Sequence, residues 1–413
     1  MINYKVRKYR NGPLVKVGTS VLSELTIQEK LGAVPTATLT IPITEWSFFD
    51  TRVEVTIDTG DYTFCGLVES VTVNKVNETV DIALNHILAE WEFDAIPINV
   101  AVKQTPISTL YSVLDFARDL WTVDVQDDYP IEYTYSRQNK LEALTSTIEN
   151  TKDIFWRVKP CGCRELEIGK FGNDSGFIIS TGNPSNTSLA IIEEPTIEID
   201  FSKIVNRAVI TSGSVGNGMG QMTLREVYDS PALYDSQFPI SITGSNINTD
   251  VTYSPLDGIH RSPNNLYEYW VTDLSSVARE GGQIYEATFT ENDLYPFSNP
   301  DQPIENQDKI DMGVRVYNRA MRKLIRSRRR QAYKMLTTPL PCSVGVGDKI
   351  RFRYSNKLIK SNKCGYNSKD EVLKVDGEFY ISELTRKWDK NQVQTNEIFI
   401  DEYLREDRSI KEY

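Results

Sequence analysis

The chain has two histidines, the side chains best suited to acid–base catalysis near neutral pH. His86 follows Asn85 at the end of a predicted strand, and His260 lies in the predicted loop 257–261. Imidazole is the usual base in hydrolysis by a nucleophile, because its pKa lies near 7. Neither histidine belongs to an HExxH, HxH or Cys–His signature. We therefore interpret both as surface or capping residues, with no catalytic role and no metal.

Paired carboxylates are a second possible chemistry, since a glycosidase needs two of them within several ångströms. Glu90 and Glu92 offer such a pair, but alternation along an extended or helical segment explains them as well. The acidic run 124–128 lacks the residue order of a calcium loop, which favours a solvated turn. The glycine-rich segment 213–218 is followed by no Lys-Ser/Thr, which favours a surface loop over a phosphate site. We predict no enzyme and no cofactor, with a carboxylate-based cell-wall hydrolase as the alternative.

Cysteine spacing gives no metal site and no disulfide framework. The five cysteines are Cys65, Cys161, Cys163, Cys342 and Cys364. Their number is odd and no CxxC pair occurs, so we predict reduced thiols made in a cytoplasm. Segment 161–163 is typical of a hairpin turn rather than a metal site.

Composition narrows the class of protein further. The chain has 413 residues, of which 40% are hydrophobic and 25% charged, so we expect two to four packed units. A net charge of −11 repels a phosphate backbone and argues against dedicated nucleic-acid binding. No basic stretch leads into an apolar run at the start, and no stretch approaches the roughly 20 apolar residues of a membrane helix. We expect neither a secretory signal nor a membrane span.

Period-two alternation predicts strands at both ends of the chain. The turn signal at 58–61 predicts a hairpin near the start, and 74–78 predicts a second one. The end of the chain is β-rich in the same way. The expected strands are 37–41, 52–57, 62–64, 71–73 and 80–84 at the start, and 331–336, 349–354, 379–384 and 396–400 at the end.

Helical spacing appears only in the middle of the chain. Thr105-Pro106 predicts a helix start, and a shorter helix should follow near Leu144. A longer helix is expected over 307–325. The apolar positions are Ile107, Leu110, Val113, Leu114 and Ala117 in the first helix, Leu141, Leu144 and Ile148 in the second, and Ile310, Val314, Tyr317, Met321 and Leu324 in the third.

The remaining middle segments read as strands and loops. Strands 154–158 and 164–168, joined at 160–163, complete an α/β arm. Glycine-, Asn- and Ser-rich loops at 171–190 and 212–221 flank an expected strand pair at 196–199 and 205–210. Residues 230–307 carry many Pro, Asn, Asp and Tyr and predict a loop-rich segment.

The two β-rich ends resemble each other at a constant offset of 316 residues (380−64). The aligned pairs are Phe64 with Tyr380, Val68 with Leu384, Ile82 with Ile398, and Leu84 with Ile400. Segment 52–57 also resembles 349–354. Any two antiparallel hairpins share alternation, so chance similarity is the alternative. A duplicated unit would allow three chains to place six similar units around one axis.

A family resemblance rests on motifs spread along the chain outside 230–307. Segment 64–68 resembles the aromatic–Gly–apolar strand of the first barrel in the tail-tip and baseplate hub proteins of bacteriophages, a family that includes the hub domain of tail-associated lysins. Segment 199–207 resembles its crossover strand, and 344–350 resembles the entry of its last barrel. Return strands through Ile381 and Ile398 follow. The motif residues are Phe64, Gly66, Val68, Gly347 and Asp348.

The resemblance implies a β-dominated α+β fold with two small β-barrels, an inserted α/β arm and one long helix. We predict these divisions along the chain: 1–98 first barrel, 99–190 arm, 191–229 crossover strands, 230–306 loop-rich insertion, and 307–413 long helix and second barrel.

The family further implies a homotrimer with a central channel at the tip of a phage tail or tail-like injection machine. Its partners would be the tail tube or distal tail ring, the tape-measure protein, and spike, fibre or receptor-binding proteins. The chain ends at Tyr413 just after the predicted second barrel, so lytic and receptor-binding roles are expected on separate chains. A carbohydrate-binding module is the remaining alternative, since tyrosines could supply stacking surfaces. These aromatic residues are Tyr253, Tyr267, Tyr269, Trp270 and Tyr285.

One concentration of positive charge lies where the predicted long helix ends. Its members are Arg319, Arg322, Lys323, Arg326, Arg328, Arg329 and Arg330. Cations are favoured at a helix C-terminus by its dipole, so we prefer a solvated helix end. The alternative is an assembly patch for an acidic neighbour or for DNA passing through a lumen. Neutralising 328–330 should leave assembly intact if the first interpretation holds.

Overall fold

The computed structural model describes most of both β-rich ends and of the arm. The described residues are 2–8, 12–20, 24–50, 52–96, 100–110, 114, 120–126, 130–135, 138–149, 151, 154–200, 204–212, 259–261, 269–291, 319–320, 322–324, 327, 330–358 and 371–401. Within these ranges, no helix combines the length and the apolar character needed to cross a bilayer.

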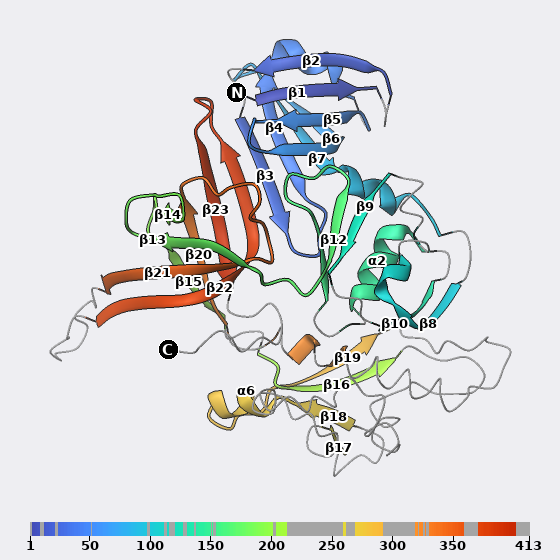
Figure 1. Cartoon of the computed structure of the whole chain (residues 1–413), viewed down its shortest axis with the longest axis vertical. Helices are drawn as coiled ribbons and strands as arrows, with labels where there is room; N and C mark the ends of the chain where they lie inside the picture. Colours follow the sequence, from blue (N-terminus) through green and yellow to red (C-terminus); the bar gives the residue numbers. More distant parts are fainter. Residues whose placement is uncertain are drawn as a thin grey trace.

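Seven strands form the beginning of the chain, and four of them overlap the five strand segments that alternation predicts there (Figure 1). In β4, for example, Leu39 and Ile41 are fully buried while Thr38 is exposed. The predicted turn between β5 and β6 is confirmed, since Gly60 adopts a φ of 93° and its amide donates to Asp58 Oδ1 at 2.8 Å. The strands are β1 Ile2–Arg7, β2 Leu14–Ser20, β3 Glu24–Lys30, β4 Thr36–Pro42, β5 Glu54–Asp58, β6 Thr63–Asn74 and β7 Thr79–His86, with a 3-10 helix η1 Ile43–Phe48 after β4.

Seven further strands gather around the end of the chain. They are β13 Asp174–Ser180, β14 Ser188–Ala190, β15 Thr196–Asp200, β20 Arg330–Thr337, β21 Lys349–Leu358, β22 Glu371–Trp388 and β23 Gln394–Asp401. The prediction of loops over 171–190 is wrong, because β13 pairs with β21 and with β14. Strands β13 and β14 therefore belong to the same sheet as β21.

One sheet contains all fourteen of these described strands. Its order is β14-β13-β21-β22-β3-β4-β7-β6-β5-β1-β2, and β23, β20 and β15 branch from β22 in that sequence. The contact between the two ends of the chain is direct, because β3 pairs antiparallel with β22. Among the described strands, β14, β2 and β15 each pair on one side only, so the described strand order contains no closed barrel. The fold is β-dominated, as predicted.

The arm packs helices and short strands around a separate core (Figure 1). Leu144 and Ile148 of α2 are buried in it, as predicted. The first predicted helix start is wrong, because 105 and 106 end strand β8, where Thr105 pairs with Ile131. A 3-10 turn begins only at Ile107. The elements are η2 Ile87–Glu92, β8 Val100–Pro106, η3 Ile107–Thr109, β9 Thr122–Val125, β10 Pro130–Tyr135, α2 Lys140–Glu149, β11 Phe155–Val158 and β12 Glu165–Gly169.

A four-stranded sheet of order β17-β18-β16-β19 occupies parts of the expected crossover and insertion. The predicted pairing of 196–199 with 205–210 is wrong, since β15 pairs with β20 while β16 pairs with β18 and β19. His260 lies in β17 rather than in a loop. The elements are β16 Arg207–Ser212, β17 Ile259–Arg261, β18 Tyr269–Thr272, α6 Leu274–Arg279 and β19 Glu286–Glu291.

Candidate functional site

Five strands occur twice in the chain with the same neighbours. The first set, which we name unit 1, has the order β3-β4-β7-β6-β5, and unit 2 has the order β15-β20-β23-β22-β21. All pairings within both sets are antiparallel. The connections 43–53 and 338–348, which join the second strand to the fifth in the two sets, are equally long.

The turn that enters the fifth strand is also repeated. In unit 1, Arg52 N donates to Val68 O and Val68 N donates to Val53 O. In unit 2, Gly347 N donates to Ile381 O and Ile381 N donates to Asp348 O. Both turns begin with a left-handed residue, since φ is 64° at Arg52 and 91° at Gly347. A β-bulge follows directly in both units, after Val68 and after Ile381.

These pairings correct the predicted alignment. Val68 pairs with Leu84 and Ile381 pairs with Ile400, so Leu84 does correspond to Ile400. Val68, however, corresponds to Ile381 and not to Leu384. The constant offset therefore holds for β7 and β23 but is wrong for β6 and β22. The physical reason is that the hairpin between β22 and β23 is longer than the hairpin between β6 and β7.

The motif residues of the resemblance lie at structurally constrained positions. Phe64 and Val68 are buried in the core of unit 1. A Cβ on Gly66 would lie 2.6 Å from Phe64 Cε1 and 3.0 Å from the Asn85 carbonyl oxygen, so no side chain fits there. A Cβ on Gly347 would lie 3.0 Å from Phe171 Cβ. These contacts explain the glycines by packing within the chain.

A buried ionic network joins unit 1 to unit 2. Arg386 of β22 is fully buried, and its Nε donates to Glu29 Oε2 of β3 at 3.3 Å. Its Nη1 and Nη2 donate to the carbonyl oxygens of Leu340 and Val344 at 2.9 and 2.6 Å. The Tyr62 hydroxyl donates to Glu29 Oε1 at 2.7 Å, and burial together with this carboxylate raises the pKa of Tyr62 well above 10.0. The network therefore fixes β22 against β3.

A second buried network joins the arm to unit 2. Arg157 of β11 donates from Nε to Glu167 Oε2 at 2.6 Å and from Nη1 to Asp348 Oδ1 at 2.9 Å. The same Nη1 donates to Val346 O at 2.6 Å, and the guanidinium lies 4.6 Å from the centre of the Phe171 ring. Burial raises the pKa of Asp348, against the opposing effect of Arg157. Asp348 thus anchors the arm as well as shaping a turn.

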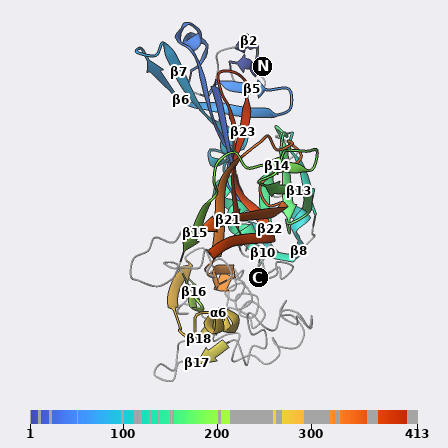
Figure 2. The same ribbon diagram turned by 90° about the vertical axis from the view of Figure 1, so that its left-hand side faces the viewer.

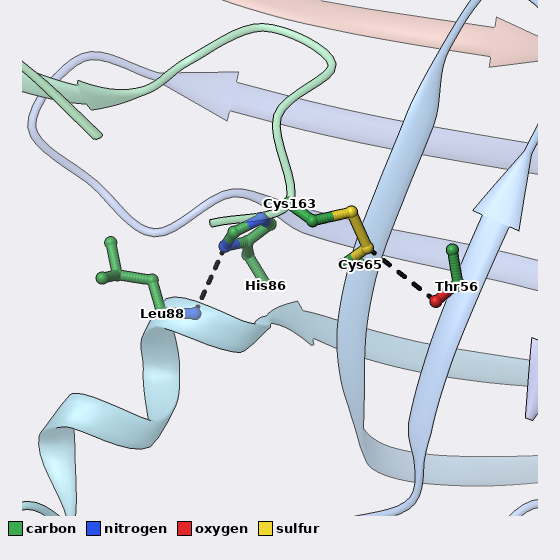
Figure 3. Close-up of a disulfide and its surroundings, with 5 residues drawn as sticks. All are labelled: Thr56, Cys65, His86, Leu88 and Cys163. Carbon is green, nitrogen blue, oxygen red and sulfur yellow. Dashed lines mark hydrogen bonds between the residues drawn. A yellow bond between two sulfur atoms is a disulfide. The ribbon is translucent and has the colours of Figure 1, made fainter. Parts of the chain in front are cut away.

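A disulfide between Cys65 and Cys163 corrects the prediction that all cysteines are reduced (Figure 3). It connects β6 to the turn between β11 and β12, with a Cα–Cα distance of 5.2 Å. Cys161 and Cys342 are free and half-buried, and burial together with the hydrogen bond between the two thiols raises the pKa of Cys161 to about 12. The predicted hairpin turn at 161–163 is confirmed, because Gly162 N donates to Lys159 O at 2.9 Å.

His86 lies beside this disulfide and caps the helix η2 (Figure 3). Leu88 N donates to His86 Nδ1 at 3.2 Å, and the ring packs against Phe64 and Trp121. Burial lowers the pKa of His86 to about 3, so the imidazole is neutral near pH 7. The predicted capping role is confirmed, whereas a surface position is not.

Two residues of the predicted basic patch donate hydrogen bonds to other residues of the same chain. Arg319 Nη1 donates to Glu149 Oε2 at 3.0 Å, and Arg322 Nη1 donates to three carbonyl oxygens at the end of α2 and the start of β11. Both side chains are buried. Lys323 Nζ lies 4.5 Å from the centre of the Phe289 ring. Arg326, Arg328 and Arg329 and the side chain of Arg330 lie outside the described residues.

The predicted long helix can be followed only in part. Residues 319–320 and 322–324 are helical, and Leu324 is fully buried. The other apolar positions named for this helix, from Ile310 to Met321, lie outside the described residues. The described turns place Arg319 and Arg322 against α2, so this stretch packs on the arm.

The residues named for a glycosidase, a calcium loop or carbohydrate stacking lie on short helices, strands or loops of the described structure, or outside the described residues. Glu92 is exposed on η2, and Glu90 is half-buried on the same short helix. Asp124 lies in strand β9, which pairs parallel with β12. Of the aromatic residues named for carbohydrate stacking, Tyr285 is 43% exposed. Segment 213–218 lies outside the described residues.

The sequence patterns did not predict the three contacts that connect unit 1, unit 2 and the arm. These are the Arg386–Glu29 network, the Arg157–Asp348 network and the disulfide. Arg386 stands on an alternating strand, where its inward orientation could have marked it as a buried cation needing partners. Strand β11 is buried at all four positions, so alternation gives no such signal for Arg157. Glu29 is 357 residues from Arg386 and Asp348 is 191 residues from Arg157, and no local pattern links these pairs. Glu167, the other carboxylate partner of Arg157, is 10 residues away on the neighbouring strand.

Comparison with known proteins gives structural relatives only. Neither a protein-family model nor a curated sequence matches the chain. The 43 kDa tail protein of prophage MuSo2 from Shewanella oneidensis is 13% identical with a TM-score of 0.54, over 97% of both chains. A tail protein from Neisseria meningitidis MC58 is 9% identical with a TM-score of 0.53, over 97% of this chain and 96% of the other.

A third solved structure, prophage tail protein gp18 from Listeria monocytogenes EGD-e, is 12% identical with a TM-score of 0.53. The alignment covers 97% of this chain and 94% of that protein. Almost the whole chain therefore has the fold of prophage tail proteins. The resemblance predicted from the sequence motifs is confirmed at the level of the fold.

Proposed function

We propose that this chain forms a homotrimeric hub at the tip of a phage tail or tail-like injection machine. The hub adapts the sixfold tail tube, or the distal tail ring, to threefold components at the tip. It organises host attachment and genome delivery without enzymatic activity of its own.

The observation that carries the proposal is the repetition of one five-strand unit within a single chain. Units 1 and 2 share strand order, the left-handed entry residue, the turn hydrogen bonds and the bulge. Three chains would present six such units around an axis, and each unit could contact an equivalent subunit of a sixfold ring. The whole-length likeness to prophage tail proteins supports the same role.

The proposal keeps the predicted barrels and revises the divisions between them. Residues 1–98 would form the first barrel with partners from other chains, and β13 to β15 would belong with the second. The arm would extend outward. Tail-tube or ring protein, tape-measure protein, and spike, fibre or receptor-binding proteins would be the partners, all assembled in the host cytoplasm into the virion tail tip.

The oligomeric state is the decisive measurement. Native mass spectrometry of the purified full chain should give a complex of three copies, and electron microscopy of purified particles labelled on this chain should place the label at the tail tip. A monomer that degrades peptidoglycan would instead establish the hydrolase alternative. Binding to purified ring protein separates the hub from a free carbohydrate-binding module, because only the hub forms a stable ring complex.

A further inference from the structure

Two strand edges in the repeated units lack a strand partner among the described residues. In β6, residues 63–67 pair with β5, but beyond Val68 only the β7 side of the strand is paired. In β15, one side pairs with β20 and the other side has no described strand. Figure 2 shows the β6–β7 hairpin projecting from the rest of the chain. Val73 on this part of β6 is 39% exposed.

The equivalent edges in the other unit are paired with each other. In β22, the strand that corresponds to β6, residues 383–388 pair antiparallel with β3. β3 is the strand that corresponds to β15, because Ile27 opposes Ala37 while Ile197 opposes Tyr333 at the matching position. The chain therefore already contains one example of the contact that the two free edges could make.

We propose that β15 of one chain pairs antiparallel with the outer half of β6 of a neighbouring chain. This inference rests on the proposed trimer and assigns its interface. Transferring the register of β22 and β3 to the equivalent strands gives the expected partners. They are Ser70 with Asp200, Val71 with Ile199, Thr72 with Glu198, Val73 with Ile197, and Asn74 with Thr196.

The residue types support this register independently. Val73 opposes Ile197 and Val71 opposes Ile199, so apolar residues meet on one face of the new pair. Polar residues meet on the other face, at 70, 72 and 74. A shift by one residue would oppose Val73 with Thr196 or Glu198 and lose this match. Both strands also gain hydrogen-bond partners for an edge that has no strand partner among the described residues.

The same contact explains why the assembly would close. Each chain offers one β6 edge and one β15 edge, so pairing is head-to-tail and generates a ring when the rotation closes. Within the chain, unit 1 contacts unit 2 through β3 and β22. Between chains, unit 2 would contact the next unit 1 in the equivalent way. Six units in three chains then share one kind of strand contact.

Engineered cysteines test the register in the full chain. The double variant Thr72→Cys with Glu198→Cys should form intermolecular disulfides under mild oxidation, giving covalent dimers and trimers on a non-reducing gel. The matched control is Gln28→Cys with Thr385→Cys, at the equivalent positions of the pair within the chain, which should form an intramolecular disulfide. Each single variant should give no covalent trimer, which controls for the native cysteines.

The outcomes separate this inference from the proposed function. A trimer with the 72–198 link supports both. A trimer in which the 28–385 control closes while 72 and 198 stay unlinked overturns the strand pairing and leaves the hub intact. A monomer in native mass spectrometry overturns both proposals.

Introducing opposite charges at two apolar positions provides a second measurement, which does not depend on disulfide geometry. Val73→Lys should weaken trimer association on the order of tenfold or more, because it places a charge opposite Ile197. Combining it with Ile197→Glu should restore part of the loss. Val76→Lys is the matched control, since Val76 is 92% exposed in the same hairpin but outside the register. Equal trimer affinity for the Val73 and Val76 variants, or no restoration by Ile197→Glu, overturns the pairing.

Discussion

Arg386 contacts residues from both β-rich ends of the chain. Its side chain contacts β3 through Glu29 and holds the connection 338–348 through two carbonyl oxygens. A buried cation is tolerated only when its partners are all in place, because desolvation costs several kcal/mol per charge. The position of β22 against β3 is therefore coupled to one guanidinium.

Arg386→Met should destabilise the chain by about 3 to 5 kcal/mol, since it leaves the Glu29 carboxylate buried without its cation. Urea unfolding followed by circular dichroism measures the difference. Arg351→Met is the control, because the Arg351–Asp376 pair is half-exposed and worth about 0 to 1 kcal/mol. Similar losses for both variants would contradict the role assigned to the buried network.

His86 should make the stability of the fold depend on acid. Its folded pKa of about 3 lies below the unfolded value of 6.5, so between these values the unfolded chain binds a proton that the folded chain does not. The free energy of unfolding should therefore fall as pH decreases from 6.5 toward 3, by on the order of 4 kcal/mol from this group.

His86→Asn tests this assignment, because asparagine keeps an acceptor for the Leu88 amide and does not titrate. Urea unfolding at several pH values should give a shallower loss for the variant between pH 6.5 and 3. Parallel curves for both proteins would show that another group controls the acid response.

At the scale of elements, the disulfide ties strand β6 to the β11–β12 turn across a sequence separation of 98 residues. Closing so long a loop restricts the unfolded chain, and typical disulfides contribute about 2 to 4 kcal/mol. A reducing agent should therefore lower the midpoint of thermal unfolding. Cys65→Ser should start at the lower midpoint and respond little to the reductant. An equal response in both proteins would place the redox effect at another cysteine.

The repeated entry turn places a left-handed residue before β5 and before β21. Gly347→Ala combines an unfavourable φ with a close contact to Phe171 and should cost about 2 to 3 kcal/mol. Gly32→Ala has a similar φ of 69° but open space, so it should cost only about 1 kcal/mol. Chemical denaturation of both variants separates strain from packing, and equal costs would contradict the Phe171 contact.

At the scale of the whole molecule, the shared sheet should make units 1 and 2 unfold together. Ile82 and Ile398 are equivalent and fully buried, and each alanine substitution should cost about 2 to 5 kcal/mol. Because β3 pairs with β22, either substitution should shift one common calorimetric transition. Two transitions that respond separately to Ile82→Ala and Ile398→Ala would show that the units fold independently.

Local sequence patterns predicted many of the strands, although not β8, β13 or β14. Alternation located β4, β5 and β20, and the turn residues at 58–61 located one hairpin, because side-chain period and turn chemistry act over a few residues. The similarity between the two ends was also visible in β7 and β23, where the offset of 316 residues is correct. The offset differs between β6 and β22, because the hairpin of β22 and β23 contains additional residues.

How these strands pair with one another followed only from the three-dimensional fold. The pairing of β3 with β22, the ion pairs Arg386–Glu29 and Arg157–Asp348, and the disulfide all connect residues that are far apart in the chain. Such contacts depend on the burial of whole surfaces rather than on local propensity, so no periodicity announces them. For the same reason, no sequence pattern marks the edges of β6 and β15 as contact surfaces. The pairing of the equivalent strands β22 and β3 indicates this role.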